Sequence, residues 1–180
     1  MTSAQSDATL PAGAQRVSER LTELGHPHAP RLLADSARTA QDAADALGVQ
    51  LGQIVKSIIF RRRSDDAAVL VMTSGDRRVD ETKVAMKVGE LTRADARFVK
   101  DSTGFSIGGV SPVAHATPSV ELIDTELFRF DVIWAAAGHP HAVFNLSPQE
   151  LLAMTGAPAV DIALPSSTRP RSPSSSPERR

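Results

Sequence analysis

The chain has 180 residues, a formal net charge of −1 and no cysteine, and 41% of its residues are hydrophobic. This composition is typical of one soluble globular domain, and the lack of cysteine excludes a disulfide framework and a thiolate metal site. No apolar run approaches the roughly 20 residues that span a bilayer, and the N-terminus lacks a signal-peptide pattern. We therefore expect a cytoplasmic protein with no membrane partner.

The two ends of the chain differ in composition from the middle. Residues 1–13 are small and polar without periodicity, and residues 165–180 consist mainly of Ser, Pro and Arg. Neither segment has enough apolar residues to offset the entropy of ordering. We therefore expect both ends to be disordered and one folded domain to occupy residues 14–164. The basic C-terminal end would add a weak, salt-sensitive attraction to RNA.

Two helices are predicted near the N-terminus. Apolar side chains recur at helical spacing in residues 14–24, and Gly25 ends this pattern. Residues 40–47 are good helix formers, and they lie between Thr39, an N-cap residue, and Gly48, a helix stop. The second helix is followed closely by the β-rich run of residues 53–60.

Lys56 interrupts the apolar, β-branched run of residues 53–60, Gln-Ile-Val-Lys-Ser-Ile-Ile-Phe. The run is typical of a strand buried on both faces, where a bare ammonium would be strongly destabilising, so Lys56 is a candidate functional residue. Alternatively, the strand lies at the edge of a sheet and Lys56 points to water. Residues 67–73 form a second β-rich run, and the two runs predict a hairpin.

Short helices and strands are predicted to alternate over the rest of the chain. Helices are expected over residues 79–88 and 95–100, and a capping box at residues 147–150 begins a helix that ends near Met154. Strands are expected over residues 120–124, 132–137 and 142–146. Because several strands are joined by short connections, we predict an α+β fold, a single domain with a mixed, mostly antiparallel sheet and surrounding helices.

A glycine-rich stretch covers residues 104–112, Gly-Phe-Ser-Ile-Gly-Gly-Val-Ser-Pro. The adjacent Gly108 and Gly109 allow backbone amides to approach a ligand closely, and Pro112 restricts the conformation that follows. Such a loop can hold an anion or a polarised carbonyl group. The pattern is neither a Walker loop nor a dinucleotide-binding fingerprint, and a tight bulged hairpin would explain the same residues without any ligand.

Four segments, residues 53–60, 103–112, 137–138 and 146–152, together resemble the YbaK/prolyl-tRNA-synthetase-associated editing domain family in order and spacing. The resemblance implies a free-standing enzyme that hydrolyses the ester between a wrongly attached amino acid and the 3′-terminal adenosine of a tRNA. Its implied partners are the 3′ end of an aminoacyl-tRNA and an aminoacyl-tRNA synthetase. No cofactor and no metal are expected, because His26 and His28 have no further ligands nearby in the sequence.

The resemblance also assigns site residues. The family's invariant lysine falls on Lys56, its glycine-rich loop falls on residues 108–112, and a late glycine near the pocket falls on Gly138. Catalytic roles are thereby implied for Lys56, Gly108 and Gly109, and substrate-binding roles for Val110, Ser111, Pro112, Gly138, Ser106 and His139. His115 lies just past the loop, either at the mouth of the pocket or in a surface turn.

Two roles stay open for Lys56. It is either a fixed positive charge that positions the tRNA end, or a base whose pKa burial brings down to about 7 to 8. The first is favoured because no nucleophile is apparent beside it, since Ser57 points to the opposite face of the strand. A non-catalytic module that binds tRNA or a synthetase is the alternative function, and a hydrolase of another small acyl ester is a third.

Overall fold

The computed structural model describes residues 9–166, and its two longest strands are β2 (Val55–Arg62) and β3 (Ala68–Ser74). They pair as the antiparallel hairpin that the sequence predicts, with Lys56 opposite Thr73. Every residue of β3 is buried, whereas β2 is half-buried from Lys56 to Ile58. The expectation of a strand buried on both faces is therefore wrong for this part of β2.

The strands form two sheets, and this hairpin belongs to the larger one. The larger sheet has the strand order β4-β2-β3-β5-β8, with antiparallel pairs up to β3 and parallel pairs from β3 to β8. The smaller sheet, β1-β7-β6, is antiparallel throughout. The remaining strands are β1 (Arg31–Leu32), β4 (Leu91–Arg93), β5 (Val120–Asp124), β6 (Ile133–Ala136), β7 (Ala142–Leu146) and β8 (Ala159–Val160). The α+β class with mixed, mostly antiparallel pairing is thus confirmed, although the strands are divided between two sheets.

The helices begin and end largely where the sequence places their caps. Thr39 and Asp42 form a capping box at the start of α2, and Gly48 ends this helix in the left-handed conformation. Ser147 and Glu150 form the same box at α5. The helices are α1 (Ala12–Glu23), α2 (Ala40–Leu47), α3 (Glu81–Val88), α4 (Ala96–Thr103) and α5 (Pro148–Thr155), with short 3-10 helices η1 (Leu51–Gln53) and η2 (Thr125–Arg129).

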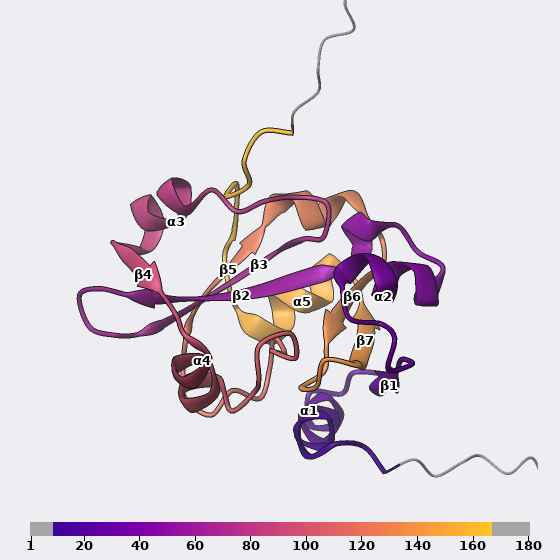
Figure 1. The fold of residues 1–180 in the computed structure, drawn as a ribbon. Coiled ribbons are helices and arrows are strands. Elements are labelled where there is room, and N and C mark those ends of the chain that lie inside the picture. The colour runs from indigo at the N-terminus through magenta and orange to yellow at the C-terminus, as the bar shows by residue number, and fades with distance from the viewer. Residues whose placement is uncertain (1–8, 167–180) are drawn as a thin grey trace, which may run out of the picture.

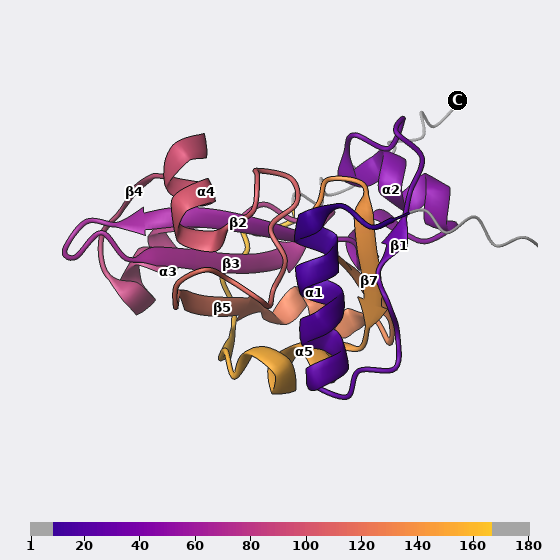
Figure 2. The same ribbon diagram turned by 90° about the horizontal axis from the view of Figure 1, so that it is seen from below.

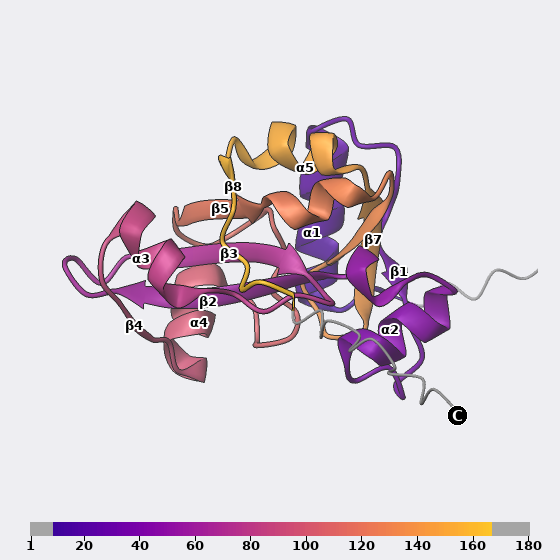
Figure 3. The ribbon, with the colours of Figure 1, turned by 90° about the horizontal axis from the view of Figure 1, so that it is seen from above.

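The alternation of side chains along β2 divides the core into two clusters. Val55 and Ile59 point into the larger cluster, which also contains Val110 and the buried side of α1. Phe60 points to the other face, into a smaller cluster with Val84 of α3. Figure 1 shows α3 and α4 on opposite sides of β2, and Figure 2 shows α1 beside β7. Figure 3 shows α2 at the end of β2 opposite to α3 and β4.

Some sequence expectations require correction. Helix α1 begins at Ala12, so two residues assigned to a disordered N-terminal end belong to the folded part. Residues 104–119 contain no strand, so the bulged hairpin proposed as a ligand-free explanation of the glycine-rich stretch is wrong. The two- and three-residue strands β1, β4 and β8 were missed because a pattern so short has no readable period. The predicted disordered ends fall mostly outside the described residues, at 1–8 and 167–180.

Among the described residues, no helix combines the length and the apolar character that crossing a membrane requires.

Candidate functional site

The edge of β2 that faces away from β3 is only partly covered. Strand β4 pairs with one end of β2, from Phe60 to Arg62. At the other end, just before β2 begins, an isolated bridge joins Ile54 to Trp134 of β6. Between these two contacts, no strand of the described residues pairs with this edge over Val55–Ile59. A strand edge left open inside a domain offers unpaired backbone groups to a ligand.

A cavity of about 320 Å³ lies at this open edge. It combines residues that are distant in sequence: Lys56 and Ser57 of β2, Gly108 and Val110 of the glycine-rich loop, and Trp134 of β6. The rest of its wall comes from α2 and the segment before it, from β2 and the residue before it, from β6, and from β7 and the turn that precedes it. Most wall residues are apolar, and the volume falls in the range of small-molecule sites.

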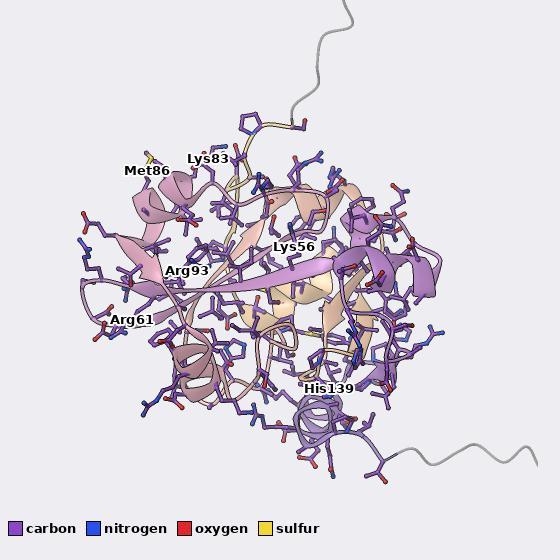
Figure 4. The ribbon with its side chains drawn as sticks, viewed as in Figure 1. Lys56, Arg61, Lys83, Met86, Arg93 and His139 are labelled. Atoms are coloured by element: carbon purple, nitrogen blue, oxygen red, sulfur yellow. The ribbon has the colours of Figure 1, made fainter. Side chains whose placement is uncertain are left out.

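Lys56 lines the cavity, and its ammonium is anchored to the turn after β3. The side chain is half-buried, and Nζ donates a hydrogen bond to the main-chain carbonyl oxygen of Arg77. Burial lowers the pKa of Lys56, the nearby Arg78 lowers it further, and Asp76 opposes both effects. The structure therefore holds Lys56, which Figure 4 labels on β2, as a fixed donor whose residue lines the cavity.

A polar cluster holds the turn that carries Arg77. Arg129 of η2 donates to the carboxylate of Asp76 through both terminal nitrogens, at 2.7 and 3.2 Å. Arg129 also donates to the hydroxyl of Ser74 at 2.9 Å, and Arg77 donates to Glu126 at 2.7 Å. Ion pairs and hydrogen bonds with Arg129 hold the pKa of Asp76 below its usual value, against the effect of burial. The carbonyl group that receives Lys56 is thus fixed by its neighbours.

The glycine-rich loop approaches the cavity through Gly108 and Val110 only. Gly108 has φ +88°, in the left-handed region that favours glycine. The amide of Gly109 is used in a turn, where it donates to the Ser106 carbonyl at 2.9 Å. A Cβ on Gly109 would lie 2.9 Å from His139 Cα, so this glycine permits the loop to pack on the neighbouring backbone. Gly109 therefore packs closely on the neighbouring backbone and is not among the residues that line the cavity.

The other predicted residues of the loop lie away from the cavity wall. Ser111 and Pro112 are buried, and the Ser111 hydroxyl accepts a hydrogen bond from the Val113 amide at 3.2 Å. Ser106 is exposed. His115 is half-buried and bonded to the Ser111 carbonyl, and burial lowers its pKa. Neither alternative for His115, the pocket mouth or a surface turn, describes this position.

Gly138 and His139 pack against the glycine-rich loop and are not among the residues that line the cavity. A Cβ on Gly138 would lie 2.3 Å from the Gly13 carbonyl oxygen of α1, so the two backbones are in direct contact there. His139 Nδ1 accepts a hydrogen bond from the His141 amide at 3.1 Å. Figure 4 shows His139 near α1 and well apart from Lys56. Pro140 of the same turn does line the cavity.

Most residues of the cavity wall were not predicted from the sequence, and the polar or aromatic ones among them include Ser57, Arg38 and Trp134. Nothing in their local pattern identifies them, because each reaches the cavity only through the packing of α2, β2 and β6. From the sequence, Ser57 was considered only as a nucleophile beside Lys56, and it was set aside because it points to the opposite face of the strand. Within residues 9–166, no group of three or more His, Cys, Asp or Glu side chains is placed to hold a metal ion.

Comparison with known proteins identifies relatives of this chain. The sequence profile of the aminoacyl-tRNA editing domain family matches residues 34–154. The crystal structure of "a putative trans-editing enzyme for prolyl tRNA synthetase" superposes with a TM-score of 0.83 at 40% identity, over 87% of this chain and 100% of that one.

Two curated sequences are also similar. "Uncharacterized protein YwhH" of Bacillus subtilis (strain 168) is 33% identical over 117 residues, which are 64% of this chain and 74% of that protein. The proline-tRNA ligase of Caldicellulosiruptor saccharolyticus is 36% identical over 80 residues, which are 43% of this chain but only 14% of the ligase.

Proposed function

Because the chain belongs to the aminoacyl-tRNA editing domain family, we propose that it is an aminoacyl-tRNA deacylase that acts in trans. The reaction adds water to the ester carbonyl of a mischarged tRNA, breaks the bond between the acyl carbon and the ribose oxygen, and returns a proton to that oxygen. The products are a free amino acid and a tRNA with a free terminal hydroxyl group.

The cavity at the open edge of β2 is the observation that carries this proposal. It brings Lys56 and Gly108, from two of the segments that resemble the editing family, to the wall of one cavity of about 320 Å³. This volume suits an aminoacyl group with part of its ribose, and the apolar wall limits the side chains that fit. The similarity to a structure described as a trans-editing enzyme supports the same reaction.

The residues at the cavity are suited to positioning and electrostatic help. An aminoacyl ester is already activated, so an oriented substrate and one donor to the developing oxyanion are enough for useful catalysis. Lys56 acts as a fixed cation rather than as a base, because its ammonium already donates to the Arg77 carbonyl. The exposed Arg38 at the cavity supplies a second positive charge for the phosphates of the tRNA end.

Deacylation of mischarged tRNAs tests the proposal. Purified protein is incubated with tRNAs, tRNA-Pro among them, that carry alanine, serine, cysteine or proline, and the remaining ester is counted over time. We expect hydrolysis of at least one mischarged tRNA far above the rate without protein. If none is hydrolysed faster while tRNA still binds, the chain is instead a binding module for tRNA or a synthetase.

Prolyl-tRNA synthetase is the proposed source of the substrate. The matched segments span only 14% and 16% of two curated proline-tRNA ligases. An editing protein that acts in trans must bind the charged tRNA while the synthetase releases it or afterwards. Adding prolyl-tRNA synthetase to the deacylation assay tests whether the two proteins compete for, or hand over, the charged tRNA.

A further inference from the structure

Ser57 combines an unbonded side-chain hydroxyl group with two main-chain groups that have no strand partner, beside the cavity. Its Oγ is the only buried side-chain nitrogen or oxygen atom of the described residues that has no hydrogen-bond partner. The side chain points to the same face of the sheet as Val55 and Ile59, toward the cluster that contains Val110. A buried hydroxyl group left unbonded is destabilising, and rotation about the Cα–Cβ bond of Ser57 would turn it toward a ligand in the adjacent cavity.

The main chain of Ser57 faces the open edge. The amide of Arg62 bonds to Ala67 beside β3, and the amide of Arg63 bonds to Glu90 beside β4. Backbone groups alternate between the two edges of an antiparallel strand, so odd-numbered residues of β2 turn toward the β4 side. Strand β4 ends its pairing at Phe60, which leaves the N–H and C=O groups of Ser57 without a strand partner.

An α-aminoacyl ester matches this arrangement. In an antiparallel pair, two opposed residues exchange two N–H···O bonds. The ammonium group of an aminoacyl ester would donate to the Ser57 carbonyl, and the ester carbonyl would accept from the Ser57 amide. For an L-amino acid, the side chain would then lie on the same face as Ser57 Oγ and beside Val110, since opposed residues share a face.

We propose that Ser57 binds the aminoacyl group as a neighbouring strand residue would, and that its hydroxyl group favours a small side chain that forms a hydrogen bond, such as that of serine. This inference rests on the proposed deacylase function and names the group that recognises the substrate. The Ser57 amide also lies where negative charge develops on the carbonyl oxygen during hydrolysis.

Two variants separate the groups of Ser57. Ser57→Ala removes only Oγ, and we expect it to lower kcat/KM for seryl-tRNA-Pro about tenfold while alanyl-tRNA-Pro changes less than twofold. Ser57→Pro removes the amide that faces the open edge, where proline is tolerated in strands, and should lower kcat/KM for both esters at least tenfold. Ser18→Ala on α1 serves as the control, and thermal melting verifies that each variant is folded.

Binding of stable analogues keeps the test independent of folding in the proline variant. Adenosine that carries L-serine or L-alanine through a 3′-amide is titrated into the parent protein, together with an analogue whose amide carbonyl is reduced to a methylene group. We expect the carbonyl analogues to bind and the reduced analogue to bind at least tenfold more weakly.

The outcomes distinguish the two proposals. If the parent protein hydrolyses an ester but Ser57→Ala retains the same seryl-to-alanyl ratio, and the reduced analogue binds equally well, the role of Ser57 is wrong while the deacylase function stands. If the parent protein neither hydrolyses any ester nor binds any analogue, the function itself fails, and the role of Ser57 with it.

Discussion

Lys56 and Arg77 are joined by a hydrogen bond that crosses from β2 to the turn after β3, with the ammonium as donor and the main-chain carbonyl oxygen as acceptor. The bond fixes a half-buried cation beside the cavity, and no carboxylate of residues 9–166 forms an ion pair with its Nζ. Such a cation keeps charge available for a substrate phosphate or carbonyl group, because a paired carboxylate would neutralise it.

Replacement of Lys56 by alanine is expected to lower kcat/KM for a mischarged tRNA at least a hundredfold, equivalent to roughly 3 kcal/mol of transition-state stabilisation. Lys83→Ala is a matched control, since Lys83 is also half-buried and also donates to a main-chain carbonyl, that of Ala163, at 2.9 Å. Rates from single-turnover deacylation check the prediction. Equal losses in the two variants would show that Lys56 acts only through stability.

Arg129→Ala is expected to lower kcat/KM about tenfold, although Arg129 is not among the residues that line the cavity. The variant loses two bonds to Asp76 and one to Ser74, which loosens the turn that carries the Arg77 carbonyl. The free energy of unfolding should fall by about 1 to 3 kcal/mol.

Arg20→Ala is the control for this change, because Arg20 forms an exposed ion pair on α1 with Glu23. Exposed pairs contribute about 0 to 1 kcal/mol, so this variant should retain its activity and nearly all of its stability. Urea denaturation and deacylation are measured on both variants. Unchanged activity in folded Arg129→Ala would contradict a positioning role for the turn.

Gly138→Ala is expected to destabilise the protein more than Gly156→Ala. Both glycines have positive φ, at +83° and +65°, so both substitutions introduce backbone strain of about 1 to 2 kcal/mol. Only at Gly138 would the new Cβ meet another backbone, 2.3 Å from the Gly13 carbonyl oxygen, whereas the space at Gly156 is open. The overpacking adds about 1 to 3 kcal/mol. Comparable midpoints of urea unfolding for the two variants would contradict this packing role.

Glu121 is expected to make stability depend on pH near neutrality. Burial raises the pKa of its carboxyl group to about 7, and the hydrogen bond from Ser119 opposes this shift only in part. Between the ordinary carboxyl pKa and about 7, the folded state binds more protons than the unfolded state, so stability falls as the pH rises through this range.

Glu121→Gln should therefore gain stability relative to the parent on going from pH 5 to pH 8. We expect a gain of about 1 to 2 kcal/mol, less than the full shift implies because the side chain is partly exposed. Ser119→Ala retains the carboxyl group and should preserve the pH dependence. A stability difference between Glu121→Gln and parent that stays constant over this range would contradict the prediction.

The local signals in the sequence account for the helices and the hairpin. The capping boxes at Thr39 and Ser147 and the stops at Gly48 and Gly156 mark the bounds of α2 and α5, because a cap involves only residues within one turn. The two β-rich runs likewise specify the hairpin of β2 and β3, whose partners are close in the chain. The resemblance to editing domains follows from the same kind of information, the order and spacing of short segments.

The open edge of β2 was decided only by the tertiary structure. Its uncovered length depends on where β4 stops and where Trp134 of β6 makes its bridge, and both partners are distant in sequence. The same holds for Gly109 and Gly138, which the sequence suggests as ligand contacts and the fold uses for close backbone packing. Ser57 carries no local signal at all, because an unpaired polar group is defined by the neighbours that it lacks, and those neighbours are set by contacts across the whole chain.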